Sequence, residues 1–267
     1  MFKTSNLTYK YEKQNKALNN MNLDFSNGNM IGIIGANGSG KSTLFMNLMG
    51  ILKPTQGQVF YKGKELTYKK KDLNNLRKEV SIVFQDPDKQ IFYSRVYDDV
   101  AFSLRNLGIE ESEINERVKQ ALTLVNSIDL IDKPVHFLSY GQKKRVAIAS
   151  VIAMNNKVVL LDEPTAGLDP ESTKAIVKIL KNLCKEGIKV VISSHDMDLI
   201  YEICDYIYVL SKGSIVIEGN CIDVFKEVKT IQAVGLNIPW LVKVHKNMNL
   251  PLFKKEEELY EYFNNLR

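Results

Sequence analysis

The sequence predicts an α/β fold in which a mostly parallel sheet is covered by helices and interrupted by a helical insert. Short apolar runs of strand length occur at residues 30–34, 157–162, 188–193 and 206–210. Helical patterns separate these runs, and strands that alternate with helices form parallel sheets buried on both faces. Between about residues 86 and 156 the pattern is helical throughout, which predicts a helical subdomain inserted between strands.

The elements expected before the insert are short strands and one helix. A strand at 22–25 is followed by Asn27-Gly28, a pair that favours a turn. Residues 30–34 form a continuous apolar run, which is typical of a strand buried on both faces. A second such strand is expected at 80–84. The helix expected at 41–49 has apolar residues at helical spacing and ends before a glycine.

Longer helices are expected within and after the insert. Ser112 is expected to cap a helix that runs to Val125, and a second helix is expected at 141–154. The helix at 171–186 carries its apolar residues on one face, as a helix packed against a sheet does. A strand at 214–218 follows the last strand of the alternating series.

Composition and charge exclude several classes of protein. The 267 residues are 45% hydrophobic and 25% charged, which is ordinary for a globular chain and excludes a disordered one. The net charge of +5 does not by itself indicate a nucleic-acid partner. The three cysteines and three histidines are widely separated, so neither a disulfide framework nor a zinc site is expected.

No segment has the length and character of a membrane span or a signal peptide. Every apolar run is far shorter than the roughly 18 residues that a spanning helix needs. The first residues, MFKTSNLTYKYEKQ, contain no apolar signal core. We therefore expect a cytoplasmic chain that does not cross a membrane by itself.

The strongest motif is the segment at residues 35–42, which reads GANGSGKS and matches the G-x-x-x-x-G-K-S phosphate loop. A buried strand precedes it and a helix follows it, so backbone N–H groups and the helix N-terminus can face phosphate oxygens. Lys41 is expected to reach the β- and γ-phosphates, and Ser42 to ligate Mg²⁺. A chance match by a glycine-rich turn is the competing interpretation, which this context disfavours.

A pair of carboxylates follows the apolar run at 158–161. The strand carries Asp162 at its carboxyl end, the edge at which open α/β sheets bind ligands. Asp162 is expected to coordinate Mg²⁺, and Glu163 to polarise an attacking water. Taken alone, Asp162 is also explained as a helix cap.

A third motif, Leu138-Ser139-Tyr140-Gly141-Gln142, stands at the start of a helix. Serine, glycine and a helix N-terminus together make an anion site. One chain has no need of a second phosphate-binding segment unless that segment serves another nucleotide. By itself, the motif is equally well explained as an ordinary capped helix start.

Together these motifs resemble the nucleotide-binding subunit of an ATP-binding cassette (ABC) transporter, whose motifs occur in the same order between residues 2 and 218. The resemblance extends to Gln85 after a strand, to Asp169 in AGLD and to His195 in SSHD. Tyr140 departs from the family pattern, which has glycine more often. Backbone interactions tolerate this change, and tyrosine occurs there in the subgroup described below.

The resemblance implies roles for these positions. Gln85 would contact Mg²⁺ and the attacking water, and His195 would bond the γ-phosphate; a surface histidine that caps a helix is the alternative for His195. Tyr11 would stack on adenine, with Tyr9 as the alternative. The residues that would hold ATP are Tyr11, Gly35, Asn37, Gly38, Ser39, Gly40, Lys41, Ser42 and Thr43. The residues that would close the partner subunit's ATP site are Ser139, Gly141, Gln142 and Asp169.

The fold implied is a P-loop NTPase ABC cassette with a RecA-like mixed sheet core, an antiparallel β subdomain and an inserted α-helical subdomain. The cassette would span residues 1–220, with the helical subdomain at about 86–156. Residues 221–267 would form a short helical C-terminal extension.

Three segments resemble the cobalt-import and energy-coupling-factor group of this family: residues 84–92, 141–149 and 234–239. The resemblance implies an ATPase at the cytoplasmic face of the membrane that drives uptake of cobalt, nickel or a vitamin. Its partners would be a second, identical or paralogous ATPase subunit, a membrane coupling protein docked near 85–99, and a membrane substrate-binding subunit. No nucleic acid is expected.

Two other functions remain as alternatives. The first is a non-transport cassette ATPase that acts on DNA or ribosomes; the chain has one cassette and only a small insert between Gln85 and Ser139, which disfavours it. The second is a P-loop small-molecule kinase, which would leave Gln85, the motif at 138–142 and His195 without a role. The sequence gives neither the cargo nor the choice between a homodimer and a heterodimer.

Overall fold

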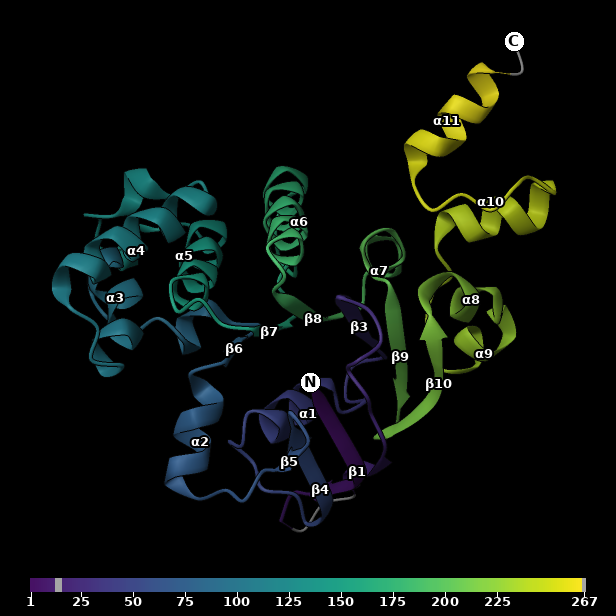
Figure 1. The fold of residues 1–267 in the computed structure, drawn as a ribbon. Coiled ribbons are helices and arrows are strands. Elements are labelled where there is room, and N and C mark those ends of the chain that lie inside the picture. The colour runs from purple at the N-terminus through teal and green to yellow at the C-terminus, as the bar shows by residue number, and fades with distance from the viewer. Residues whose placement is uncertain (13–15, 266–267) are drawn as a thin grey trace. The chain divides into compact units, whose positions relative to one another are not determined.

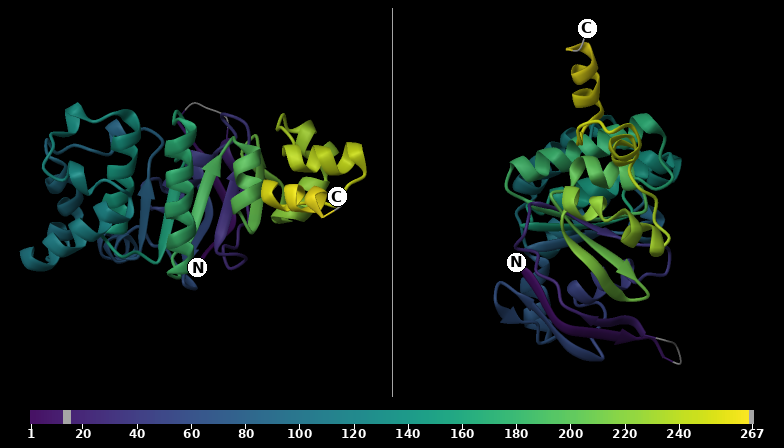
Figure 2. Two further views of the ribbon diagram at one scale, coloured as in Figure 1. Left: turned by 90° about the horizontal axis from the view of Figure 1, so that it is seen from above. Right: turned by 90° about the vertical axis from the view of Figure 1, so that its right-hand side faces the viewer.

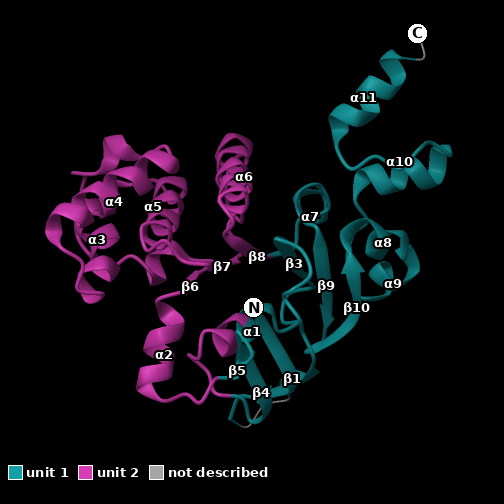
Figure 3. Cartoon of the chain, viewed as in Figure 1, with its two compact units in different colours: residues 1–44, 54–65, 193–267 teal, residues 45–53, 66–192 magenta. Residues whose placement is uncertain are grey.

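A computed structural model describes residues 1–12 and 16–265 of the chain. The chain divides into two compact units, drawn in teal and magenta in Figure 3. Unit 1 comprises residues 1–44, 54–65 and 193–267, and unit 2 comprises residues 45–53 and 66–192.

Unit 1 contains an antiparallel sheet in the order β2-β1-β4-β5 and a second group of strands in the order β10-β9-β3. In the second group, β3 runs parallel to β9, and β9 and β10 form an antiparallel hairpin (Figure 1). All residues of β3 are buried, as its apolar composition predicts. The strands of unit 1 are β1 (Phe2–Lys10), β2 (Lys16–Met21), β3 (Met30–Ile34), β4 (Gln56–Tyr61), β5 (Lys64–Glu65), β9 (Tyr206–Ser211) and β10 (Ser214–Asn220).

Helix α1 begins in unit 1 directly after the phosphate loop, and the remaining helices of this unit follow β8. In the C-terminal part, the Tyr201 hydroxyl donates to the Phe253 carbonyl at 3.0 Å, and Lys254 Nζ donates to the Cys204 carbonyl at 2.9 Å. These bonds tie the segment between α10 and α11 to the C-terminal part of α7 and the residue after it. The helices are α1 (Lys41–Leu48), α7 (Met197–Ile203), α8 (Cys221–Lys226), α9 (Val228–Ala233), α10 (Trp240–Met248) and α11 (Glu256–Asn264).

Unit 2 combines parallel strands with a group of helices. Strand β6 pairs in parallel with β7, and β8 is the next strand beside β7. Helices α3, α4 and α5 pack on one another (Figures 1 and 2), and their apolar residues form the core of that group. The elements are α2 (Lys70–Arg77), β6 (Val80–Val83), α3 (Val96–Asn106), α4 (Glu111–Leu124), α5 (Tyr140–Ile152), β7 (Val158–Asp162), α6 (Pro170–Lys185) and β8 (Lys189–Ser194), with short 3-10 turns η1 (Pro87–Lys89), η2 (Ile128–Leu130) and η3 (Val135–Phe137).

The structure confirms the predicted α/β fold and corrects two details. The strand expected at 22–25 is wrong: the strand is β2, and residue 24 forms only an isolated bridge to Lys3. The Ser112 cap is also wrong: α4 begins at Glu111, so Ser112 lies inside the helix, and Glu110 at the cap position makes no side-chain capping bond. Within the described residues, no helix is both long and apolar enough to cross a bilayer.

Candidate functional site

The phosphate loop joins β3 to α1 in unit 1, as its sequence predicts. Gly35 leaves no room for a side chain, since a Cβ there would lie 2.4 Å from the Leu210 carbonyl oxygen and 2.5 Å from Ser39 Oγ. Gly40 has a φ of +108°, which side chains rarely tolerate. The glycines therefore allow the loop to fold tightly against the end of β9.

Two side chains of the loop have a polar group that a phosphate could engage. Lys41 is 7% exposed, and its Nζ donates to the carbonyl oxygens of Gly35 at 2.8 Å and Ala36 at 3.4 Å. Ser39 Oγ is buried and has no hydrogen-bond partner. A buried hydroxyl without a partner is costly, so a bound phosphate oxygen would satisfy a group that the protein leaves unsatisfied.

Tyr11 lies beside the start of α1. Its hydroxyl is 3.2 Å from Thr43 Oγ1, and its ring meets the ring of Tyr9 edge-on at a centroid distance of 5.0 Å. Tyr11 is 36% exposed. Unit 1 thus brings an exposed aromatic ring to the helix that follows the phosphate loop.

His195 follows β8 in unit 1 and is exposed, whereas the serines before it are buried. The cap of α7 is Asp196, whose carboxylate accepts from the Leu199 N–H at 3.0 Å. The capping role considered as the alternative for His195 therefore belongs to its neighbour.

The two carboxylates stand at the end of β7 in unit 2 and are each 4% exposed. Glu163 has a φ of +48°, in the left-handed region that residues other than glycine seldom adopt. Its carbonyl oxygen accepts from Lys144 Nζ at 2.7 Å and from the Ala166 N–H at 3.2 Å. The turn after Asp162 is thus fixed partly by a lysine from α5.

The motif at 138–142 starts α5 with a capping box. Ser139 Oγ accepts from the Gln142 N–H at 3.3 Å, and Gln142 Oε1 accepts from the Ser139 N–H at 2.9 Å. The helix-start interpretation is therefore correct as a local description. It is compatible with an anion site, because the first N–H groups of a helix have no partner within the helix.

The start of α6 lies beside the start of α5 within unit 2. A Cβ at Gly141 would lie 3.3 Å from Ser172 Oγ, and one at Gly167 would lie 3.3 Å from the Tyr140 ring. Asp169 caps α6: its carboxylate accepts from the Ser172 N–H at 2.9 Å and the Ser172 hydroxyl at 2.8 Å. These bonds hold the pKa of Asp169 below its ordinary value.

Gln85 is exposed and follows β6, and its segment touches α5. The Tyr140 hydroxyl donates to the Gln85 carbonyl at 3.2 Å. Lys143 Nζ forms an ion pair with Asp88 at 2.6 Å. Unit 2 therefore connects three predicted segments: Gln85, the motif at 138–142, and Glu163.

Sequence reasoning missed Lys144 as a contact of this site. Its side chain is 0% exposed. Burial lowers the pKa of Lys144 to about 8, although Glu163, Asp162 and Asp86 favour the charged form. The sequence does contain a signal for this contact: Lys144 lies one turn before Ile148, on a face of α5 that is otherwise apolar.

An aromatic cluster lies after Gln85 and comprises Phe92, Tyr93 and Phe102. Phe92 is 65% exposed, and its ring meets that of Phe102 edge-on at 4.7 Å. The buried carboxylate of Asp99 accepts from the N–H groups of Phe92 at 3.1 Å and Tyr93 at 3.2 Å. Burial raises the pKa of Asp99, an effect that these two bonds oppose.

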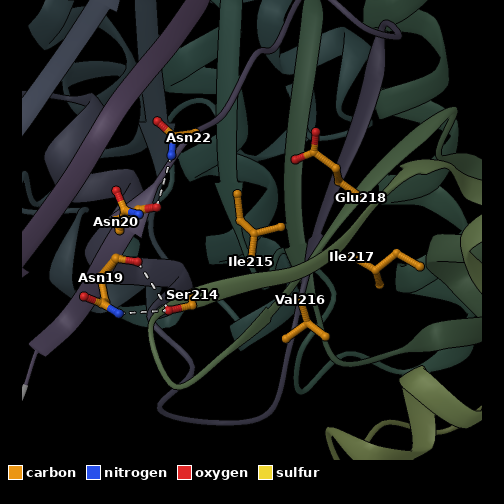
Figure 4. Close-up of a pocket in the computed structure, with 8 residues that line it drawn as sticks. All are labelled: Asn19, Asn20, Asn22, Ser214, Ile215, Val216, Ile217 and Glu218. Carbon is orange, nitrogen blue, oxygen red and sulfur yellow. Dashed lines mark hydrogen bonds between the residues drawn. The ribbon is translucent and has the colours of Figure 1, made fainter.

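A separate groove in unit 1 lies between β2 and β10 (Figure 4). Asn19 Nδ2 and Ser214 Oγ are 3.4 Å apart there, and Asn22 Nδ2 donates to the Asn20 carbonyl at 3.3 Å. None of the predicted site residues lines this groove.

Comparison with known proteins gives one family. A sequence model described as ABC transporter matches residues 18–166. The cobalt import ATP-binding protein CbiO of Salmonella typhi is 49% identical over 260 residues, 97% of this chain and 96% of its own. The energy-coupling factor transporter ATP-binding protein EcfA of Methanocaldococcus jannaschii is 45% identical over 253 residues, 93% of this chain and 91% of its own.

A solved structure agrees with this assignment. CbiO1 from Clostridium perfringens, described as part of the ABC transporter complex cbiONQ, superposes with a TM-score of 0.78 at 43% identity. The match covers 92% of this chain and 98% of CbiO1.

Proposed function

Because this chain belongs to the ABC transporter family and is an ATPase of the cobalt and energy-coupling-factor importer type, we propose that ATP closes a dimer of such subunits to drive import of cobalt, nickel or a vitamin. ATPases of this family dimerise and work with membrane components of transporters. The partner subunit in this dimer would be a second copy or a paralogue.

The observation that carries the proposal is the phosphate loop. The phosphates of ATP would bind against its tightly folded glycine backbone. They would also meet the buried Lys41 ammonium and the Ser39 hydroxyl, which has no hydrogen-bond partner. Exposed Tyr11 beside Thr43 supports Tyr11 rather than Tyr9 as the ring that stacks on adenine.

The donor set also suits Mg²⁺, which prefers oxygen ligands and keeps several waters and phosphate oxygens in its shell. Ser42, Asp162 and Gln85 would hold the ion. When bound, Mg²⁺ neutralises charge on the phosphates.

The residues of the chain would perform hydrolysis as follows. Glu163 and His195 orient and polarise a water in line with the γ-phosphate, while Lys41 offsets the charge that develops there. Ser139, Gly141, Gln142 and Asp169 of each chain would act on the partner's nucleotide. Contacts to the γ-phosphate from both chains would exist only in the closed dimer, so ATP would shift the population toward closure.

The segment 85–99 supports a membrane partner. The aromatic cluster exposes large apolar side chains, and exposed apolar surface of this kind is typical of protein interfaces. We propose that helices of a membrane coupling protein dock here, which would place the chain at the cytoplasmic face of the membrane beside a substrate-binding subunit. The relatives give no support to an ATPase that acts on nucleic acid or ribosomes.

Purification of the complex from native membranes tests this proposal. We expect mass spectrometry to find a second cassette ATPase, a membrane coupling protein and a membrane subunit that retains cobalt, nickel or a vitamin. An ATPase that purifies without membrane subunits and is stimulated by DNA would contradict it. Phosphoryl transfer to a metabolite would instead indicate a kinase.

A further inference from the structure

We propose that Lys144 and Tyr140, both on α5, are positioning residues that hold Glu163 and the Gln85 segment of the same chain. The inference rests on the proposed function, since it assigns Glu163 and Gln85 to hydrolysis. It gives the helix that starts at the 138–142 motif a role within its own chain, in addition to its contacts with the partner's nucleotide.

Lys144 makes a specific bond at a strained place. Its Nζ donates at 2.7 Å to the carbonyl oxygen of Glu163, whose φ of +48° is rare outside glycine. Such backbone persists only where surrounding interactions hold it. The Ala166 N–H reaches the same oxygen at the longer distance of 3.2 Å, so Lys144 provides the shorter of these two bonds.

A lysine is an unfavourable choice for a purely structural position here. The side chain is 0% exposed, and the other buried residues of α5 are apolar, including Ile148 one turn later on the same face. A buried ammonium must be hydrogen-bonded to be tolerated. Burial lowers the pKa of Lys144 to about 8, whereas an apolar residue would pack without that penalty.

Tyr140 lies one helical turn before Lys144 and links that lysine to the Gln85 segment. Its ring lies 5.8 Å from Lys144 Nζ, within range of a cation–π contact. Its hydroxyl donates to the Gln85 carbonyl at 3.2 Å. Residues four apart on a helix share a face, so one face of α5 contacts both segments, and a displacement of α5 would be transmitted to Glu163 and Gln85.

The test uses the intact transporter complex and substitutions that remove one bond each. Lys144→Met removes the donor and keeps an unbranched apolar chain, and Lys144→Gln restores a neutral donor. Tyr140→Phe removes only the hydroxyl. Lys119→Met, on the exposed face of α4, is the matched control for a lysine-to-methionine change.

We expect Lys144→Met to lower kcat about tenfold or more while the dissociation constant for ATP changes by no more than about twofold, because a charge-assisted bond is lost away from the nucleotide. Lys144→Gln should recover most of this loss, and Tyr140→Phe should lower kcat about threefold. ATP-bound closed dimers should accumulate in Lys144→Met, which a general packing defect would not produce.

Wild-type kcat in Lys144→Met, or a loss confined to ATP affinity, would overturn the inference. If Lys144→Met does not fold, Tyr140→Phe decides: an unchanged kcat overturns the inference, and a lowered kcat with unchanged affinity supports it. Glu163→Gln separates the two proposals. Normal hydrolysis in Glu163→Gln refutes the proposed function itself, whereas an inactive Glu163→Gln beside a fully active Lys144→Met refutes only the positioning role.

Discussion

Two of the buried lysines, Lys41 in unit 1 and Lys144 in unit 2, place their ammonium groups in different surroundings. Lys41 in unit 1 donates to Gly35 and Ala36, residues of its own loop, and it begins a helix whose first N–H groups can bind an anion. Lys144 in unit 2 donates across 19 residues to Glu163. In the proposed function the first exchanges its bonds for a phosphate, whereas the second holds the backbone of the segment to which we assign hydrolysis. Burial of a lysine therefore does not by itself reveal whether it binds ligand or holds the protein.

The largest difference between the two lysines should appear in nucleotide binding. Lys41→Met removes a cation from the phosphate cradle, so we expect the affinity for ATP to fall at least about a hundredfold, with hydrolysis lost. Titration calorimetry on Lys41→Met and Lys144→Met measures the contrast. Wild-type affinity for ATP in Lys41→Met would contradict the claim that Lys41 binds the nucleotide and Lys144 does not.

A second substitution tests the backbone of the loop that holds Lys41. Gly35→Ala places a Cβ against the Leu210 carbonyl and Ser39 Oγ, so we expect a destabilisation of about 2–3 kcal/mol and weak ATP binding. Gly108→Ala is the control, because that glycine has a φ of +73° but open space around it, and the substitution should cost only about 1 kcal/mol. Urea denaturation compares the two, and equal losses would contradict the steric argument.

The smallest expected effect is a pH dependence at Lys144. Its folded pKa of about 8 lies below the unfolded value near 10.4, so between these values the unfolded chain binds more protons and the free energy of unfolding rises with pH. The groups that favour its charged form are Glu163, Asp162 and Asp86. Relative to Lys144→Met, the wild type should gain about 2 kcal/mol between pH 8 and pH 10. A constant difference over this range, measured by denaturant titration, would contradict the assigned burial cost.

The sequence predicts features that depend on neighbouring residues, but not contacts that depend on the fold. The phosphate loop and the alternation of strands and helices from β7 to β9 follow from patterns within a few residues of one another, and the sequence predicts both. The Lys144–Glu163 bond depends on the fold bringing α5 to the end of β7, and only the apolar neighbours of Lys144 hint at it. Strand β2 was missed because its polar sequence, KALNNM, has little apolar alternation to mark it. The start of α4 was placed at the wrong residue because its first turn needs no side-chain cap.

Hydrolysis by Glu163→Gln in the reconstituted complex tests the central claim most directly. The glutamine keeps the shape of the side chain but cannot polarise water as the carboxylate does. We predict that the variant binds ATP with wild-type affinity, accumulates as an ATP-bound closed dimer, and loses steady-state turnover and cargo uptake together. Normal turnover in this variant would contradict the assignment of Glu163 and the mechanism built on it.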